Sequence, residues 1–198
     1  MSKLRTVGIV LYDEVEVMDF AGPFEVFSTA SRMSEGARPF EVSTVAREPR
    51  VRARGGLVVM PTATLEERSS FDVLLIPGGV VDAELERSDV LDWIERASRT
   101  AEITASICTG AFFLTRLGLL DGLRVTTHWE DADALEKAWP QLRVDRDARF
   151  IDNGRIVTSA GISAGIDMAL HLVARLEGEA LAIKTARQMD YAWRREGS

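Results

Sequence analysis

Short, nearly unbroken apolar segments alternate along this chain with longer segments whose apolar residues recur at helical spacing. The segments 5–11 (RTVGIVL), 72–76 (DVLLI) and 102–107 (EITASI) are rich in aliphatic and β-branched residues, a pattern typical of strands covered on both faces. The segment 89–99 has its apolar residues on one helical stripe. Because strands that alternate with helices are joined by right-handed crossovers, this order predicts a mainly parallel sheet with helices on both faces.

The remaining segments fit the same scheme. We expect a strand at 40–46, a hairpin at 51–60, a strand ending at 126–128, and a segment at 150–159 that turns at Asn153-Gly154. Helices are expected at 19–33, 109–117, 130–138, 162–176 and 180–193. The sequence therefore predicts an α/β fold, a flavodoxin-like three-layer sandwich with a mainly parallel sheet. No internal repeat or linker interrupts it, so we expect one domain over residues 1–198.

The size and charge of the chain narrow its class. With 198 residues, of which 46% are hydrophobic, it can bury one substantial core. A formal net charge of -7 without a Lys/Arg-rich tract disfavours nucleic acid as a direct partner. The chain has no signal-peptide pattern, and no segment approaches the roughly eighteen apolar residues of a membrane span. We therefore expect a cytoplasmic protein with no membrane partner.

Cysteine and histidine are scarce in this sequence. A single cysteine excludes an intramolecular disulfide and a cysteine-based zinc site, and two histidines offer little for a histidine-rich metal centre. We expect neither a bound metal nor a cofactor. Any chemistry at the one thiol must proceed without a second thiol from the same chain.

Residues of unusual chemistry follow four of the predicted strands. Asp19 comes after the first strand, Gly78-Gly79 after DVLLI, Cys108 after EITASI, and His128 after RVTT. Because ligands of open parallel sheets bind beyond the carboxyl ends of the strands, we expect these residues to share one rim.

Cys108 lies in the run SICTG, where a buried strand is expected to turn directly into a helix. The small residues Thr109 and Gly110 allow a sharp bend, as in a nucleophile elbow. A lone cysteine in an apolar context can also be an inert core residue. A helix N-terminus, however, stabilises a thiolate and lowers the pKa of the thiol. The position therefore favours a reactive Cys108.

Asp19 has two interpretations. It can cap the N-terminus of the helix that it begins, or it can face Cys108 as an acid/base. An ionised carboxylate beside the thiol would raise the pKa of the thiol by charge repulsion. Asp19 therefore assists catalysis only if the two groups share a proton, in which case they titrate as a pair and can pass that proton to a substrate.

The other candidate residues also have a structural alternative. Gly78 and Gly79 either form a plain strand-ending turn or offer their N–H groups to an anion. Thr109 either begins a helix or contacts a substrate. His128 is either a base or pocket residue, or a histidine that packs on Trp129.

The pocket walls are expected to come from the first helix, the loop after Gly79, and the residues Ala160, Gly161 and Ile162. These segments are mostly apolar, which favours a small uncharged substrate. A small molecule is therefore the partner that we expect at this site.

Longer motifs resemble the DJ-1/PfpI superfamily along nearly the whole chain. They are VGIVLYDEVEVMDFAGPFEVF, DVLLIPGG, SICTGAFFLTRLGLLDG, VTTHW and TSAGISAGIDMAL. MDFAGP and CTG are most similar to the isocyanide hydratase branch and to the domain that precedes the DNA-binding half of some AraC-type regulators. The PfpI-type proteases have a histidine directly after the cysteine, where this chain has Thr109, so the resemblance disfavours proteolysis. The DJ-1-like branch has a glutamate where this chain has Asp19.

The resemblance implies a role for each candidate residue. Cys108 would be the nucleophile, Asp19 the proton-sharing acid/base, Thr109 a substrate contact, and Gly78 and Gly79 part of an anion-binding rim. It also implies a homodimer. The implied activity is the hydration of a small electrophile such as an isocyanide, without a cofactor. A non-catalytic ligand-sensing domain and a cysteine redox sensor stay open as alternatives.

Overall fold

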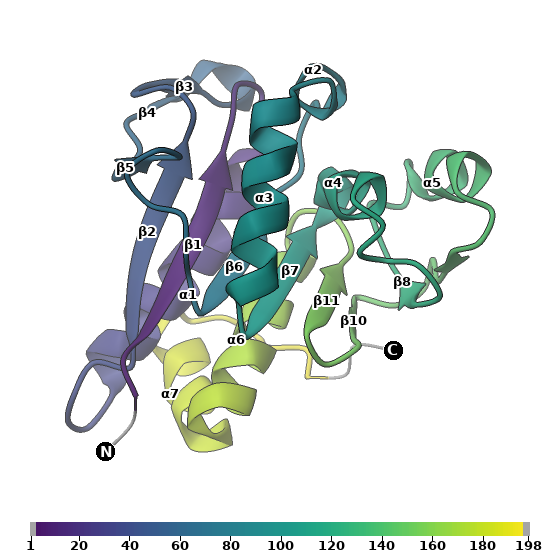
Figure 1. Ribbon diagram of the computed structural model, residues 1–198. Helices are drawn as coiled ribbons and strands as arrows, with labels where there is room; N and C mark the ends of the chain where they lie inside the picture. Colours follow the sequence, from purple (N-terminus) through teal and green to yellow (C-terminus); the bar gives the residue numbers. More distant parts are fainter. Residues whose placement is uncertain (1–2, 196–198) are drawn as a thin grey trace.

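A computed structural model describes residues 3–195 and has a seven-stranded sheet at its centre (Figure 1). The strands lie in the order β10-β11-β7-β6-β1-β2-β5. All neighbours are parallel except β10 and β11, which form an antiparallel hairpin at one edge. The bounds of the strands are β1 Arg5–Leu11, β2 Phe40–Ala46, β5 Ala63–Thr64, β6 Val73–Ile76, β7 Ile103–Ile107, β10 Phe150–Asp152 and β11 Ile156–Ser159.

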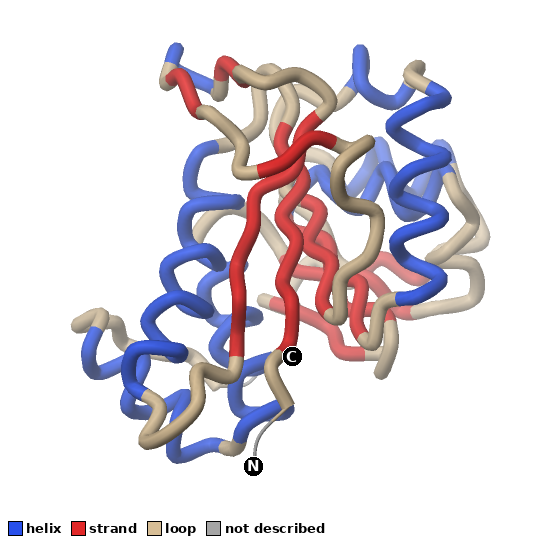
Figure 2. Tube along the Cα trace, turned by 60° about the vertical axis from the view of Figure 1, so that its left-hand side comes forward, coloured by secondary structure: helices blue, strands red, loops and turns tan. Residues whose placement is uncertain are grey.

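Helices cover both faces of the sheet (Figures 1 and 2). The helices α1, α6 and α7 pack together on one face, and α3 lies across the other. None of the helices in residues 3–195 is both long and apolar enough to cross a membrane. The helix bounds are α1 Val17–Met33, α2 Asp82–Leu85, α3 Ser88–Thr100, α4 Ala111–Arg116, α5 Ala132–Ala138, α6 Ala164–Glu177 and α7 Glu179–Gln188. The predicted three-layer α/β fold with a mainly parallel sheet is confirmed.

The pattern of apolar residues explains how these layers pack. Every residue of β7 is buried, as expected for a strand covered on both faces. In α3 the residues Val90, Trp93, Ile94 and Ala97 form the buried stripe that the sequence predicts. Burial of each large aliphatic or aromatic side chain of this kind contributes about 1.5–3 kcal/mol. The core therefore extends on both sides of the central strands and holds their ends in fixed positions.

The strand order changes direction at β1. β2 lies on one side of β1, whereas β6 and then β7 lie on the other. In sheets of this kind a crevice opens beyond the carboxyl ends of the strands at such a switch point. The ends of β1, β6 and β7 therefore meet at the place where the sequence predicts a site.

The segment RVTT differs from its prediction as a strand of the main sheet. Only its first two residues form a strand, β8, and that strand belongs to a separate two-stranded ladder. The Thr126 N–H donates to Thr158 Oγ1 at 3.0 Å, and the Thr127 hydroxyl donates to the Cys108 carbonyl at 2.8 Å. These bonds replace a strand ladder and still attach the segment to the end of β7.

Two small ladders lie outside the main sheet. One pairs β3 Val51–Arg52 with β4 Val58–Val59, which are separated by the 3-10 turn η1 Arg54–Gly56. The other pairs β8 Arg124–Val125 with β9 Arg143–Val144.

Candidate active site

Cys108 lies where β7 ends, in a turn that leads straight into a helix. The turn is a 3-10 segment, η2 (Cys108–Gly110), and α4 follows it directly. Cys108 has a φ of 55°, a left-handed conformation that costs a residue with a side chain about 1–2 kcal/mol. The residue is only 7% exposed. A strained residue at a strand-to-helix turn is the geometry of a nucleophile elbow.

Two glycines let neighbouring backbone approach this turn. A Cβ atom on Gly110 would overlap the carbonyl oxygen of Ile76 at the end of β6, and one on Gly78 would lie 2.6 Å from the Thr109 nitrogen. Side chains are excluded at both positions, because Cβ contacts shorter than 3.0 Å essentially do not occur. The ends of β6 and β7 can therefore lie side by side at Cys108.

The N–H groups of Gly78 and Gly79 are both bonded within the protein. The Gly78 N–H donates to Asp19 Oδ2 at 3.0 Å. The Gly79 N–H donates to Thr109 Oγ1 at 2.8 Å, and the Thr109 hydroxyl donates back to the Gly79 carbonyl at 2.9 Å. The predicted anion-binding role of Gly78 and Gly79 would thus require one of these bonds to be exchanged for a bond to the ligand.

Asp19 is fully buried in the first turn of α1. The helix begins at Val17 with Glu16 in the N-cap position, and no side-chain bond closes this cap. The N-cap interpretation of Asp19 is therefore wrong. Its Oδ2 atom accepts the Gly78 N–H, whereas Oδ1 has no hydrogen-bond partner in the described part of the chain. A buried carboxyl oxygen without a partner is costly and is found where chemistry requires it.

The surroundings raise the pKa values of both Asp19 and Cys108. Burial raises the pKa of Asp19 to about 7, although the Gly78 N–H opposes this rise. Burial and the charge of Asp19 raise the pKa of Cys108 to about 12, against the opposing effect of Thr109. This direction is opposite to the lowering that a helix N-terminus predicts. The helix is only six residues long, so its dipole is weak and burial dominates.

Asp19 and Cys108 therefore titrate as a coupled pair. The Cys108 side chain lowers the pKa of Asp19, whereas the charge of Asp19 raises the pKa of Cys108 and so disfavours a thiolate. Near neutral pH the carboxyl group is close to the midpoint of its titration and can either take or give a proton. Movement of the thiol proton to Asp19 leaves a single negative charge on the pair, which is the step that the predicted shared proton requires.

A pocket of about 400 Å³, which we call the main pocket, opens in front of Cys108. Its volume is within the range of small-molecule sites. The sequence predicts a mostly apolar wall, and this prediction is wrong. Charged side chains from segments outside the predicted walls also line the pocket. The apolar lining residues are Val80, Val81, Phe112, Ala134 and Ile162, and the polar ones include Glu16, Arg54, Asp82, Thr109, His128, Glu130 and Asp131.

His128 and the loop after β11 form one side of the main pocket. Ile162 lines it and has a φ of 53°. Gly161 packs so closely against the His128 ring that a Cβ atom there would overlap it. Ala160 and Gly161, which the sequence also predicts in the wall, are not lining residues. The Glu130 N–H donates to Nδ1 of His128 at 3.4 Å, and Asp131 Oδ2 lies 3.4 Å from the same nitrogen.

Phe112 and the residues before and within α5 were not predicted as pocket walls. Phe112 comes from the first turn of α4, Glu130 and Asp131 come from the segment that leads into α5, and Ala134 lies within α5. The sequence contains a signal for the second group, namely the acidic run WEDAD directly after His128. Phe112 has no such signal, because an apolar residue in a short helix is typical of the core.

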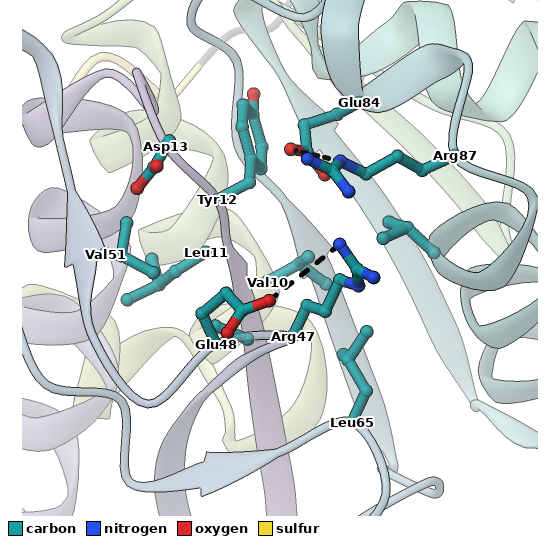
Figure 3. A pocket seen from close by; sticks show the side chains of 12 residues that line it. Val10, Leu11, Tyr12, Asp13, Arg47, Glu48, Val51, Leu65, Glu84 and Arg87 are labelled. Atoms are coloured by element: carbon teal, nitrogen blue, oxygen red, sulfur yellow. Dashed lines mark hydrogen bonds and ion pairs between the residues drawn. The ribbon is translucent and has the colours of Figure 1, made fainter.

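A second, much smaller cavity lies at the ends of β1 and β2 (Figure 3). Its volume of about 50 Å³ is too small for an organic substrate. Tyr12 lines this cavity: its hydroxyl donates to the Pro77 carbonyl at 2.9 Å, and burial, Asp19, Cys108 and Glu84 all raise its pKa. The main pocket is therefore the candidate site.

Comparison with known proteins agrees with the motifs. The DJ-1/PfpI family model matches residues 5–175. The chain belongs to the DJ-1/PfpI family. It is 33% identical over 189 residues to the isonitrile hydratase of Pseudomonas putida. The matched residues cover 94% of this chain and 78% of that protein. Among solved structures, a THiJ/PfpI family protein from Pseudomonas syringae matches with a TM-score of 0.84 and 27% identity, covering 96% of this chain and 76% of that one.

A transcription regulator is also similar to this DJ-1/PfpI domain. The chain is 33% identical over 172 residues to the HTH-type transcriptional regulator CdhR of Pseudomonas aeruginosa. The matched residues cover 87% of this chain and 51% of the regulator. The chain thus spans about half of the length of that protein. Both branches that the motifs resemble are therefore represented among its relatives.

Proposed function

We propose that this DJ-1/PfpI family member is a cofactor-independent hydratase that adds water to a small electrophile, and that organic isocyanides are its substrates. The observations that carry the proposal are the burial of Asp19, the mutual effect of Asp19 and Cys108 on their pKa values, and the position of Cys108 in the wall of the main pocket. The identity of 33% with the isonitrile hydratase of Pseudomonas putida supports the choice of electrophile.

The proposed reaction needs water as its only co-reactant. As the sulfur of Cys108 attacks the terminal carbon of R–N≡C, the thiol proton passes to Asp19 and from there to that carbon, giving the thioimidate R–N=CH–S–Cys. Water then adds across the C=N bond. Its hydroxyl group binds to carbon, and Asp19 carries its proton to nitrogen. Cleavage of the C–S bond releases R–NH–CHO, and the hydroxyl proton returns to sulfur. Because the pKa of Asp19 is about 7, it can act in both directions near neutral pH.

Thr109 and His128 have supporting roles in this proposal. The Thr109 hydroxyl is bonded twice to Gly79, so we propose that it holds the elbow against the end of β6. His128 accepts the Glu130 N–H at Nδ1, packs against Gly161 and shapes the side of the main pocket. Neither residue is needed to move the proton in this proposal, because Asp19 is the acid that acts on the thiol.

Formamide formation from a small alkyl or aryl isocyanide tests the proposal directly. We expect Cys108→Ala to abolish turnover and Asp19→Asn to lower kcat by about hundredfold or more. Circular dichroism verifies that both variants fold. If wild type is no faster than Cys108→Ala, the assignment fails.

A ligand-sensing domain without turnover is the second candidate. It is supported by the identity of 33% with the regulator CdhR over 87% of this chain. Thermal shift with a set of metabolites detects binding, because a ligand of the native state raises its melting temperature. Binding without formamide formation would favour this candidate. A redox sensor is less favoured, because the raised pKa of Cys108 leaves little thiolate to oxidise.

We also propose that the protein acts as a homodimer, as the family resemblance implies. Light scattering on the purified protein should give twice the mass of one chain. The mass of a single chain at micromolar concentration would reject the homodimer without affecting the proposed reaction.

A further inference from the structure

Tyr12 is a buried residue that the proposed reaction does not use. It follows β1 directly and is only 5% exposed. Its ring packs against Phe113 of α4, with the two ring centroids 5.5 Å apart. Its hydroxyl points away from Arg47 and Glu48 in the wall of the smaller cavity (Figure 3). Within residues 3–195 this hydroxyl has one hydrogen-bond partner, the Pro77 carbonyl, at 2.9 Å.

The Pro77 carbonyl and the Gly78 N–H belong to the same peptide group. The carbonyl accepts the Tyr12 hydroxyl, and the N–H donates to Asp19 Oδ2 at 3.0 Å. Resonance couples the two ends of a peptide group, so a hydrogen bond to its oxygen makes its N–H a stronger donor. Tyr12 and Asp19 are thus joined by a continuous chain of two hydrogen bonds through one peptide group.

The Pro77–Gly78 peptide group is held in place by its surroundings. The Gly78 carbonyl accepts the Glu16 N–H at 2.8 Å. On another side, even a Cβ atom on Gly78 would lie only 2.6 Å from the Thr109 nitrogen. A change on the carbonyl side of the peptide group therefore reaches Asp19 through the strength of the Gly78 hydrogen bond, and not through a rotation of the peptide group.

We propose that Tyr12 is a positioning residue for Asp19, because its hydroxyl polarises the peptide group whose N–H holds the carboxylate. This inference rests on the proposed function, in which ionised Asp19 accepts the proton of Cys108. It adds a residue that does not line the main pocket and that acts through the strength of one hydrogen bond. A stronger bond to the carboxylate favours its ionised form.

The tyrosine hydroxyl can act only as a donor to the carbonyl. The titratable neighbours of Tyr12 are Asp19, Cys108 and Glu84. Burial, and then the charges of these neighbours, raise the pKa of Tyr12 well above its ordinary value. The hydroxyl therefore stays protonated at every pH at which the protein is assayed, and its effect on the peptide group does not change sign.

The surroundings of Asp19 determine the direction of the effect. Burial and the charge of Glu16 raise its pKa, while the Gly78 N–H and the Cys108 side chain lower it. Tyr12→Phe removes none of these groups and keeps the aromatic ring. It weakens the Gly78 hydrogen bond, so the pKa of Asp19 should rise above its value of about 7.

The pH profile of turnover separates this role from a purely structural one. Because ionised Asp19 accepts the thiol proton, kcat/KM should rise with pH through the pKa of Asp19. In Tyr12→Phe we expect the midpoint of this rise to move up by about half a pH unit. At about pH 6, kcat/KM should then be about threefold lower than in wild type, whereas the two should be nearly equal at about pH 8.5. A loss by the same factor at every pH, or an unchanged profile, overturns the proposal.

Tyr191→Phe is the matched control. The Tyr191 hydroxyl also donates to a backbone carbonyl, that of Ser163, at 3.4 Å. The N–H of that peptide group belongs to Ala164 and donates to another backbone carbonyl, so this chain of hydrogen bonds does not reach Asp19. The midpoint should stay that of wild type. Equal shifts in the two variants would contradict a specific role of Tyr12.

Carbon NMR of the Asp19 carboxyl group tests the proposal without any substrate. Its signal is identified by its absence from Asp19→Asn, and its titration midpoint should be higher in Tyr12→Phe than in wild type. A raised midpoint supports the role of Tyr12 even if no isocyanide is hydrated. An unshifted midpoint overturns that role whatever the outcome of the isocyanide assay.

Replacement by meta-fluorotyrosine gives a test of opposite sign, which also serves if Tyr12→Phe does not fold. The fluorinated phenol is more acidic and so is a stronger donor. Because the chain has two tyrosines, incorporation into Tyr191→Phe replaces Tyr12 alone. The titration midpoint of Asp19 should then be lower than in Tyr191→Phe with ordinary tyrosine. A midpoint that rises or stays fixed overturns the proposal.

Discussion

Asp19 is a carboxylic acid whose burial opposes ionisation while its bonded neighbour favours it. Burial raises its pKa to about 7, and the Gly78 N–H, which donates to Oδ2 at 3.0 Å, limits that rise. In the unfolded chain the pKa is near its ordinary value of 3.8. Between these two pH values the folded protein holds a proton that the unfolded chain has lost, so the free energy of unfolding depends on pH through this residue.

We predict that Asp19→Asn removes part of the pH dependence of stability. Because the pKa of Asp19 is raised on folding, its contribution to stability is fully present below about pH 4 and is lost as the pH rises to about 7. The loss amounts to about 4 kcal/mol at most. Urea unfolding between these pH values should show the free energy of unfolding of wild type falling relative to that of Asp19→Asn. A difference that stays constant with pH would contradict the raised pKa.

Thr109 allows a second test, of the link between the elbow and β6. Thr109→Val has nearly the same shape but leaves the Gly79 N–H and carbonyl without the hydroxyl that bonds both. We expect this substitution to cost about 1–3 kcal/mol of unfolding free energy. Thr109→Ser retains the hydroxyl and should cost less than about 1 kcal/mol. Urea unfolding compares the two variants, and equal costs would show that the hydroxyl bonds are unimportant.

The identity of these residues was predictable from sequence, whereas their ionisation was not. Asp19 and Cys108 each follow a predicted strand, so their shared rim follows from the parallel order of the sheet. Their pKa values depend on burial, which no local pattern reports. The occupied N–H groups of Gly78 and Gly79 were equally out of reach, because their partners come from α1 and from the turn after β7.

At the scale of secondary-structure elements, the elbow depends on the close approach of β6 to the turn after β7. Gly110→Ala would place a Cβ atom on the carbonyl oxygen of Ile76, where no flexible side chain can give way. We expect a loss of about 3 kcal/mol in unfolding free energy and at least about a hundredfold loss of turnover, because the thiol is displaced.

Gly154→Ala is the matched control for that substitution. Gly154 has a φ of 86°, but a Cβ atom there would meet no atom within 4 Å. It should therefore cost only the strain of a positive φ, about 1 kcal/mol, and leave turnover unchanged. If Gly110→Ala were as mild as this control in thermal unfolding and turnover, the close approach would not determine the elbow.

Elements with an unbroken apolar pattern were the most predictable. β1 (Arg5–Leu11) and β2 (Phe40–Ala46) have the bounds that the sequence predicts. The β-branched residues of RVTT favour a strand, yet its threonines bond to β11 and to the elbow instead. The last predicted helix, 180–193, ends at Gln188. In both cases long-range contacts, which local patterns do not report, decide the outcome.

At the scale of the whole molecule, the segment after α7 packs against the start of α6. The Arg194 N–H donates to Asp167 Oδ1 at 2.9 Å, and Trp193 Nε1 donates to the Asp167 carbonyl at 3.3 Å. Asp167 is fully buried near the start of α6, and Arg149 Nε donates to its Oδ2 at 2.7 Å. The Asp167 residue thus connects α6 to Arg149 and to the segment after α7. Ile162, which lines the main pocket, precedes α6 in the chain.

We predict that Asp167→Ala releases the segment 191–195. Removing this carboxylate leaves Arg149 without its partner, so the unfolding free energy should fall by about 3 kcal/mol. Amide hydrogen exchange at Arg194 should accelerate at least about tenfold, while exchange in α3, which is distant from Asp167, should change only as far as global stability does. Glu179→Gln is the control, because it breaks the exposed pair with Arg195 and should cost less than about 1 kcal/mol. Unchanged exchange at Arg194 in Asp167→Ala would mean that other contacts hold the segment in place.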